Sequence, residues 1–155
     1  MNKALNQANA PENREKQAGV VVSLQICPAH RAPMEPRETV RAIENLGLEG
    51  DRHAVPDVPR QVLLVEQEVL DRFGLAAGAV KENITTSGVQ LMDLAPGTRL
   101  GIGAAVLELT KACHPCSRMD EIRPGLQEML EGQRGMLARV LHSGEIRLGD
   151  VIRIV

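Results

Sequence analysis

Two cysteines that lie three positions apart, Cys113 and Cys116, are the residues of this chain best suited to chemistry. They follow the apolar run at residues 104–109 and precede a polar turn at residues 117–120, so a predicted strand ends in a loop that carries both thiols. A thiolate held at such a position attacks a substrate, exchanges with a disulfide or binds a soft metal. Which of these three happens largely decides the function of the protein.

Disulfide exchange and structural zinc are two interpretations of this pair. A thioredoxin-like site needs its cysteines between a strand and a helix at the start of a βαβ unit, whereas this pair lies late in the chain and Asp120 separates it from the next predicted helix. A tetrahedral zinc site needs two more ligands, which Cys27 and His30 could supply. One alternative is therefore a non-catalytic scaffold with zinc on Cys27, His30, Cys113 and Cys116. A simpler interpretation of Cys27 is a buried, inert side chain.

The third interpretation is that Cys116 alone is exposed and binds a soft metal or a metal-containing cofactor. Such a site needs other groups to hold the rest of the cofactor. Arginine binds phosphate and carboxylate groups through two parallel hydrogen bonds, and imidazole and amide groups add further donors. Three polar clusters carry groups of this kind, and their candidate residues are Arg52, His53, Arg60, Gln61 and Asn83. The alternative for each cluster is a solvated surface loop or a simple turn before a strand.

The composition of the chain excludes several classes of function. Its 155 residues fit one domain, and the formal net charge of -2 gives no field that would draw the protein to nucleic acid or membranes. With one Phe, no Trp and no Tyr, it lacks the aromatic platforms on which single-stranded nucleic acids stack. No apolar run approaches the roughly 18 residues of a membrane span, and the N-terminus lacks the apolar stretch of a secretory signal. Three cysteines, an odd number, argue against a disulfide framework, so we expect a cytoplasmic protein.

Apolar patterning predicts more strands than helices. Residues 1–17 carry almost no apolar mass, and we expect them to form a disordered tail before a single domain at residues 18–155. The predicted strands cover residues 19–26, 61–65, 83–86, 99–111, 136–141, 144–148 and 151–155, and the predicted helices cover residues 36–46, 66–73 and 122–131. Within residues 99–111, we expect a turn or bulge at residues 101–103. Because the helices are few and do not alternate regularly with strands, we expect a mainly β fold, a closed or partly closed β-barrel with a few peripheral helices.

Several segments, taken in order, resemble the MOSC domain, the module named for the C-terminal part of molybdenum cofactor sulfurases. Gly47-Leu-Glu-Gly-Asp-Arg-His53 is similar to the early Gly-x-x-Gly-Asp-Arg-His segment of that family, and residues 82–85 are similar to its Glu-Asn-hydrophobic segment. Cys113-His-Pro-Cys116 falls where the family carries its cysteine, with Cys116 at the invariant position. The closing segments, residues 134–141 and 144–150, resemble the short stand-alone bacterial members. Each motif is weak alone, whereas the ordered set, over roughly residues 19–155, is fairly specific.

The resemblance implies a fold like the MOSC and pyruvate kinase β-barrels and a role in binding the molybdenum cofactor, molybdopterin. It also implies that the thiolate of Cys116 is the metal ligand. The residues that would hold the pterin and its phosphate are Arg52, His53, Arg60, Gln61 and Asn83. The neighbouring His114 or Asp120 would supply a proton during catalysis. No lysine lies in a recognisable Schiff-base context, so we expect no pyridoxal phosphate in this domain.

Two activities agree with this implied role. In the first, the protein is the terminal component of a reductase of N-hydroxylated substrates and receives electrons from separate electron-transfer proteins. In the second, Cys116 carries a persulfide sulfur to the molybdenum centre, Cys113 resolves that persulfide as a disulfide, and a sulfur-donor protein is the partner. The sequence leaves open whether the chain is an enzyme, an oxidoreductase or a sulfur-transfer protein.

Overall fold

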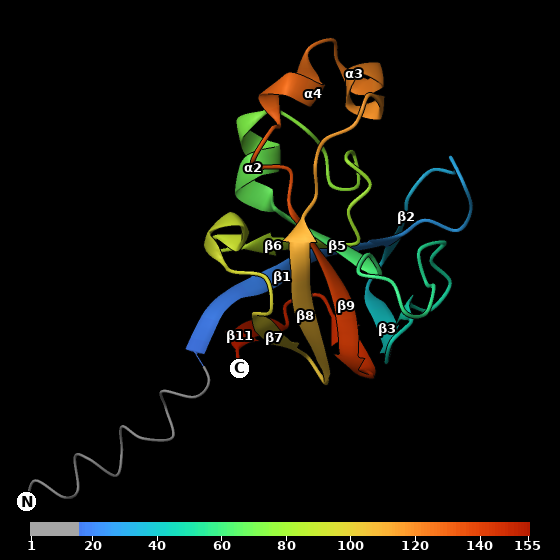
Figure 1. Ribbon diagram of the computed structural model, residues 1–155, viewed down its shortest axis with the longest axis vertical. Helices are drawn as coiled ribbons and strands as arrows, with labels where there is room; N and C mark the ends of the chain where they lie inside the picture. The colour runs from blue at the N-terminus through green and yellow to red at the C-terminus, as the bar shows by residue number, and fades with distance from the viewer. Residues whose placement is uncertain (1–15) are drawn as a thin grey trace, which may run out of the picture.

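Seven strands of this chain close into a β-barrel in the computed structural model, which describes residues 16–155 (Figure 1). Residues 1–15, most of the predicted tail, lie outside the described residues. The last two residues of that predicted tail, Lys16 and Gln17, belong to the first strand, β1 (Lys16–Ile26). The expected mainly β barrel with a few peripheral helices is confirmed.

The order of the strands around the barrel explains how it closes. That order is β1 (Lys16–Ile26), β6 (Ile84–Ser87), β5 (Val62–Glu66), β9 (Met136–His142), β8 (Ala105–Ala112), β7 (Arg99–Ile102) and β11 (Val151–Ile154). Strand β11 pairs with β1, which closes the ring. Strands β5 and β6 run parallel and the other neighbouring pairs run antiparallel, so the barrel is mixed. Outside the ring, β2 (Glu35–Arg37) pairs with β1, and β10 (Gly144–Arg147), β3 (Thr39–Ile43) and β4 (Gly47–Leu48) form a small second sheet.

Strand β1 reaches three partners because it is long and irregular. Its start pairs with β11, its middle with β6 and its end with β2. The register shifts between Gln17 and Gly19 and again between Val21 and Ser23. Such bulges bend a strand and increase its twist, which a narrow closed barrel requires.

Two hydrophobic cores share the strands β5 and β9. Val62 and Leu64 point into the barrel core, while Leu63 and Val65 face a second core on the other side of the strand. This follows from the period of two along a strand, and it explains why β5 is apolar without alternation. The second core is completed by Leu137 of β9, by Val80 of the loop before β6, and by residues in or beside the helices and the cysteine loop, namely Val69, Leu70, Cys113, Met119, Leu126 and Leu130.

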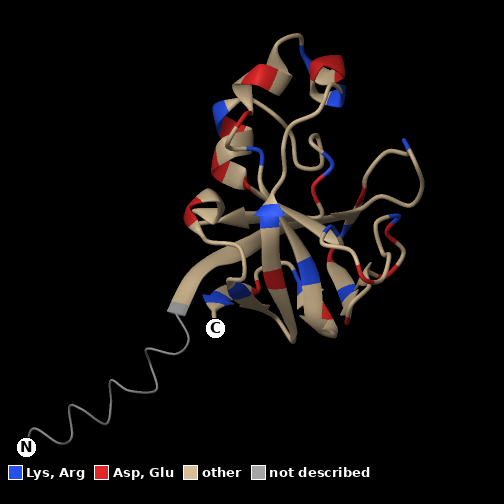
Figure 2. Ribbon diagram, viewed as in Figure 1, with Lys and Arg blue, Asp and Glu red and all other residues tan. Residues whose placement is uncertain are grey.

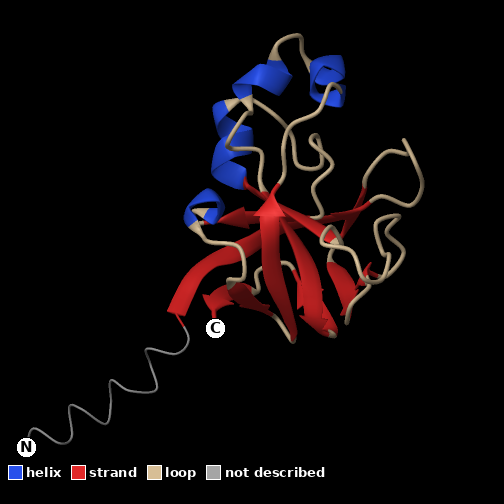
Figure 3. Cartoon of the chain, viewed as in Figure 1, coloured by secondary structure: helices blue, strands red, loops and turns tan. Residues whose placement is uncertain are grey.

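The helices α2 (Gln67–Arg72), α3 (Arg118–Ile122) and α4 (Leu126–Met129) lie together at one end of the barrel (Figure 3). A short 3-10 helix, η1 (Leu91–Asp93), lies beside the strands. In residues 16–155, no helix has both the length and the apolar character needed to cross a bilayer. Met119 of α3 belongs to the second core. This core therefore holds α3, and with it the loop that carries Cys116, against the outside of β5 and β9.

The helix predicted at residues 36–46 is wrong, because this segment forms β2 and β3. Val40, Ile43 and Leu46 have a helical spacing, but residues 39–43 alternate between exposed and buried, as a strand does. Strand β3 pairs with β10 near the end of the chain, with Val40 opposite Ile146, and Pro36 lies on the edge strand β2. Long-range pairing thus outweighs the local spacing.

The single helix predicted at residues 122–131 is also wrong, because two short helices, α3 and α4, occupy this region. Pro124 lies near the start of the predicted helix, but in the structure it follows the end of α3. The residue before a proline avoids the helical region, and Arg123 accordingly has φ of -158° and ψ of 127°. Gly125 then turns the chain with φ of 87°, so that Leu126 is buried while Ile122 stays exposed.

The other predicted elements are confirmed with small shifts at their ends. Strands β1, β5, β6, β9, β10 and β11 and helix α2 overlap the segments predicted for them. The segment predicted at residues 99–111 forms two strands, β7 and β8, which a turn at residues 103–104 joins into a hairpin, next to the turn or bulge predicted at residues 101–103.

Candidate functional site

The loop after β8 presents its two cysteines differently. Cys113 is 6% exposed in the second core, and its backbone N–H donates to the carbonyl of Gly135 at 2.9 Å, which ties the loop to the start of β9. Pro115 is buried, whereas Cys116 is exposed. The carbonyl of Cys116 accepts a hydrogen bond from the N–H of Met119 at 2.9 Å. The thiol of Cys116 is thus accessible on a loop that is fixed on both sides.

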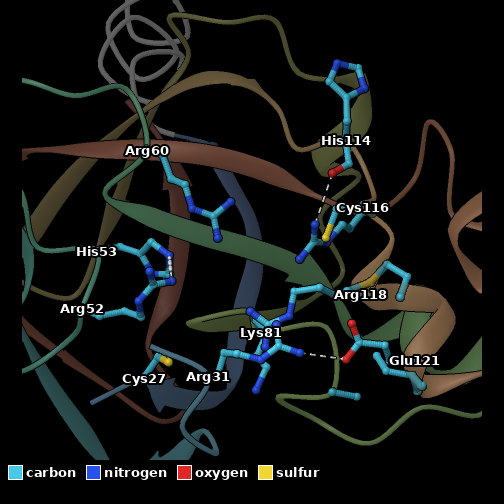
Figure 4. Close-up of a pocket in the computed structure, with 14 residues that line it drawn as sticks. Cys27, Arg31, Arg52, His53, Arg60, Lys81, His114, Cys116, Arg118 and Glu121 are labelled. Carbon is cyan, nitrogen blue, oxygen red and sulfur yellow. Dashed lines mark hydrogen bonds and ion pairs between the residues drawn. The ribbon is translucent and has the colours of Figure 1, made fainter. Parts of the chain in front are cut away.

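Cys116 lines a cavity of about 420 Å³ to which the barrel loops and α3 contribute (Figure 4). A cavity of this size suits a small molecule or a cofactor. Five of the predicted site residues line it, namely Arg52, His53, Arg60, His114 and Cys116. Six further lining residues have functional side chains, namely Cys27, Arg31, Lys81, Arg118, Glu121 and Arg134.

The cavity is strongly basic. Six of its side chains carry a positive charge, namely Arg31, Arg52, Arg60, Lys81, Arg118 and Arg134. Several Lys and Arg lie on the loops between the barrel and the helices, which meet at this site (Figure 2). Glu121 is the one carboxylate among the lining residues, and it pairs with Arg31 at 3.1 Å. The excess of positive charge favours an anionic ligand.

Buried Asp51 holds the part of the cavity wall that carries Arg52 and His53. Its carboxylate accepts hydrogen bonds from the backbone N–H groups of Cys27 at 2.7 Å and His53 at 2.9 Å. Burial by itself raises the pKa of Asp51, but the hydrogen bonds from the His53 side chain and from these two N–H groups outweigh it, so the pKa lies below its ordinary value. Asp51 therefore remains ionised and acts as a structural anchor.

His53 connects this anchor to Arg52. Its Nδ1 lies 3.3 Å from Oδ2 of Asp51, and its Nε2 lies 3.1 Å from Nη1 of Arg52. A guanidinium can only donate, so the imidazole satisfies both contacts when it carries its proton on Nδ1. His53 thus orients Arg52 toward the cavity. The imidazole of His53 also lines the cavity itself.

Arg134 is a buried cation beside the cysteine loop. It is 5% exposed, and its Nη1 donates to the carbonyl of His114 at 3.2 Å while its Nη2 donates to the carbonyl of Val80 at 2.8 Å. Its Nε is buried without a hydrogen-bond partner among the described residues. A desolvated charge without a counter-ion is costly, so Arg134 is suited to meet an anion in the cavity.

Three predicted site residues lie outside the cavity lining. Gln61 is fully buried, and its side-chain oxygen accepts a hydrogen bond from the N–H of Val140 at 3.0 Å. Asn83 is 2% exposed, and its side-chain oxygen accepts a hydrogen bond from the N–H of Leu63 at 3.0 Å. The carboxylate of Asp120 accepts from the N–H of Gln127 at 2.9 Å and so stabilises the turn before α4. These three side chains support the fold around the site.

His114 contributes to the cavity wall, but its ring points away from the other labelled residues in Figure 4. The side chain is 81% exposed, and its Nδ1 lies 3.5 Å from a carboxylate oxygen of Glu131. Its carbonyl, by contrast, accepts the hydrogen bond from Arg134. In this arrangement, the backbone of His114 serves the site and its imidazole faces solvent.

The alternative zinc site does not form in this structure. Across residues 16–155, no group of three or more His, Cys, Asp or Glu side chains is placed to hold a metal ion. Cys27 lines the cavity with Cys116, but its thiol donates to the carbonyl of Ala29 at 3.1 Å. His30 is exposed and lies outside the lining, as does buried Cys113. The four residues of that alternative therefore do not converge.

Five charged residues of the cavity were not among the predicted site residues, namely Arg31, Lys81, Arg118, Glu121 and Arg134. Two of them carried a signal. Lys81 begins the polar cluster that includes Asn83, and Arg118 lies two positions after Cys116. Arg31, Glu121 and Arg134 come from separate segments, and only the closed barrel brings them to one cavity.

The chain belongs to the MOSC domain family, because the family model matches residues 49–153, more than half of its length. The match includes Arg52, His53, Arg60 and the cysteine loop. No curated protein matches the chain significantly in sequence. The resemblance noted from the ordered motifs is therefore confirmed at the level of the family.

Solved structures share the fold of this chain. The YUAD protein from Bacillus subtilis has a TM-score of 0.72 and 19% identity, and the match covers 90% of this chain and 96% of that one. YiiM from Escherichia coli has a TM-score of 0.68 and 17% identity, covering 88% and 69%. YiiM from Geobacillus stearothermophilus has a TM-score of 0.64 and 20% identity, covering 91% and 75%. At these identities, the likeness concerns the fold alone.

Proposed function

We propose that this protein binds the molybdenum cofactor in the cavity, with the thiolate of Cys116 as the protein ligand of the metal. The observation that carries the proposal is an exposed thiol on a cavity lined by six basic side chains and one already paired carboxylate. Membership of the MOSC family, which takes its name from an enzyme of this cofactor, supports the same role.

The donor set fits such a cofactor. A thiolate is a soft ligand of the kind that a sulfur-bound metal accepts. The phosphate of the pterin needs charged donors, which the guanidinium groups of Arg52 and Arg60 supply. The buried Nε of Arg134, which lacks a partner among the described residues, is a further donor for an anionic group. Cys116, Arg52 and Arg60 are therefore the residues that would hold the cofactor.

When bound, the cofactor supplies a metal centre that exchanges oxygen atoms and electron pairs with a substrate. The chain itself binds and orients that group: His53 fixes Arg52, and Arg134 holds the cysteine loop through the carbonyl of His114. In the reductase role, the substrate would be N-hydroxylated and separate proteins would supply electrons. In the sulfur-carrier role, Cys113 would have to reach Cys116. Because Cys113 is buried outside the cavity lining, the geometry favours the role in which Cys116 acts alone.

The basic wall gives a direct test of this proposal. The wild type, the double variant Arg52→Gln with Arg60→Gln, and the control Arg139→Gln would each be purified from a host that makes the cofactor. Arg139 is exposed and pairs with Glu108 at 2.8 Å. Arg139→Gln therefore also replaces an arginine by a neutral amide, but outside the cavity lining. Pterin, oxidised to its fluorescent form, and molybdenum would be measured per chain.

We expect the double variant to lose about tenfold or more of its pterin and molybdenum, because two charged hydrogen-bond donors to the phosphate are removed. The control should keep the wild-type content. Equal pterin in the double variant and the wild type would contradict the proposal, as would a wild type that holds neither pterin nor molybdenum. Thermal unfolding of each variant would show that the fold is intact.

A further inference from the structure

We infer that the cavity contains a second anion-binding group around Cys116, and that the small-molecule substrate of the site carries a carboxylate that this group binds. The group consists of Lys81, Arg118 and Arg134, and we call it the proximal basic group. Arg52, His53 and Arg60 form the distal basic group. The inference rests on the proposed function, because it assigns the phosphate of the cofactor to the distal basic group.

The two groups lie on different sides of the cavity. In Figure 4, Arg52, His53 and Arg60 lie on one side of the view, while Cys116 and Arg118 lie on the other. The distal residues come from the segment between β4 and β5, whereas Arg118 belongs to α3. The two groups therefore offer two separate positions for anionic parts of a ligand.

The proximal basic group is connected to Cys116 on both sides of the cysteine. Arg118 follows Cys116 by two positions. Arg134 donates to the carbonyl of His114, which precedes Cys116 by two positions. Arg134 also donates to the carbonyl of Val80, the residue before Lys81, and so links Lys81 to the same loop. A ligand that reaches the thiol of Cys116 therefore meets these charges.

The positive charges of the proximal basic group have no counter-charge in the described chain. The Nζ of Lys81 donates to the carbonyl of Ala32 at 3.3 Å. The guanidinium of Arg118 forms no hydrogen bond or ion pair with residues 16–155, and that of Arg134 bonds only to carbonyl groups. Glu121, the one carboxylate among the residues that line the cavity, is paired with Arg31.

An ionised Cys116 would supply one negative charge against three positive ones. Arg134 is buried, and a buried charge without a counter-ion is costly, so a ligand that brings negative charge to the group removes that cost. A carboxylate suits this position because guanidinium groups bind it through two parallel hydrogen bonds and an ammonium group adds a further donor. The proximal basic group therefore selects substrates with a carboxylate over neutral ones of the same shape.

Benzoate and benzamide test this selection, because they share ring and size and differ in charge. Each would be titrated calorimetrically into the full-length protein, since the chain has no Trp or Tyr to report binding by fluorescence. The variants are Arg118→Gln and Lys81→Gln for the proximal basic group, Arg52→Gln for the distal basic group, and Arg139→Gln as a surface control. Molybdenum per chain would be measured on the same samples.

We expect benzoate to bind the wild type about tenfold more tightly than benzamide, as one charge-assisted contact would give. Arg118→Gln and Lys81→Gln should each remove most of that preference, and Arg139→Gln should keep it, while Arg52→Gln should lower the molybdenum content more than it lowers the preference. Equal affinity of the wild type for the two probes, or no binding of benzoate at millimolar concentration, would overturn the inference. A preference lost in Arg52→Gln and kept in Arg118→Gln would also overturn it.

The same samples separate this inference from the proposed function. If molybdenum is present but the preference for benzoate does not depend on Arg118 and Lys81, the second anion site is wrong and the cofactor role stands. If molybdenum is absent and the preference still depends on these two residues, the cofactor role fails and the anion site stands.

Discussion

Asn83 and Asp51 are joined by a buried hydrogen bond, in which Nδ2 of Asn83 donates to Oδ1 of Asp51 at 3.0 Å. Asn83 lies directly before β6, and Asp51 lies in the loop that carries Arg52 and His53. The bond therefore couples a barrel strand to the distal wall of the cavity. Asn83 acts on the site through Asp51, as a positioning residue, and its own side chain stays out of the cavity lining.

We predict that Asn83→Ala lowers the free energy of unfolding by about 2–4 kcal/mol, because it leaves a buried N–H of Leu63 without its partner and removes one of the two hydrogen bonds to Oδ1 of Asp51. Urea unfolding followed by circular dichroism measures this loss. Gln90→Ala is the matched control, because Gln90 is an exposed amide without a side-chain capping bond, and it should change stability by less than about 0.5 kcal/mol. If both variants cost the same, Asn83 does not have this role.

The sequence predicted the barrel because its strands carry their own apolar patterns. Strand β8 alternates between buried and partly buried residues, and the first four residues of β5 are apolar because each face of the strand meets a core. The helix predicted at residues 36–46 was wrong because the partner of β3, strand β10, lies far along the chain, and only the folded sheet reveals this pairing. The single helix predicted at residues 122–131 was wrong because proline occurs both in the first turn of a helix and just after the end of one, so Pro124 alone does not distinguish the two cases.

The candidate site was predictable where the motif itself lies on a loop, as for Arg52 and Cys116. Gln61 and Asn83 could not be distinguished from cavity residues. The sequence pattern of an amide near a basic residue is the same whether the amide points into the cavity or into the protein interior. Their partners, Val140 and Leu63, are known only from the pairing of strands. Arg134 escaped detection because its neighbours in the site come from other segments of the chain.

Glu82 should make the stability of the protein depend on pH in a specific direction. Its carboxyl is fully buried, and one oxygen accepts from the N–H of Gly78 at 2.7 Å and the hydroxyl of Thr85 at 3.1 Å, while the other has no partner among the described residues. Burial raises the pKa of Glu82 above its ordinary value of 4.5, and these hydrogen bonds only partly oppose the rise. The unfolded chain therefore loses this proton at lower pH than the folded one.

It follows that the contribution of Glu82 to the free energy of unfolding is fully present below the pKa of the unfolded chain, which is the ordinary value of 4.5. This contribution is lost as the pH rises through the higher pKa of the folded protein. We predict that Glu82→Gln gains stability relative to the wild type as the pH rises from 5 to 8, by at most about 1.4 kcal/mol per pH unit. Urea unfolding at several pH values measures this difference. The exposed Glu128→Gln should run parallel to the wild type. A parallel course for Glu82→Gln would show that Glu82 titrates alike in both states.

Gly135 should tolerate no side chain. Its φ is 150°, and a Cβ there would collide with the carbonyl oxygen of Leu64 and lie 2.8 Å from Cγ2 of Val65. We predict that Gly135→Ala costs about 2–4 kcal/mol of stability, because backbone of β5 would have to move. Gly132→Ala is the matched control: φ is 79°, with no atom within 4 Å of the added Cβ, so the expected cost is about 1–2 kcal/mol. Thermal or urea unfolding of both variants ranks them, and a smaller cost at Gly135 would contradict the geometry.

The central claim is that the thiol of Cys116 binds the metal, and molybdenum per chain, measured by elemental mass spectrometry after purification from a cofactor-producing host, tests it most directly. The matched pair is Cys116→Ser and Cys113→Ala, because the first changes the exposed thiol and the second a buried one. We predict that Cys113→Ala retains the wild-type content, while Cys116→Ser falls about tenfold or more, because a soft ligand is replaced by a hard one. Equal molybdenum in Cys116→Ser and the wild type would contradict the claim.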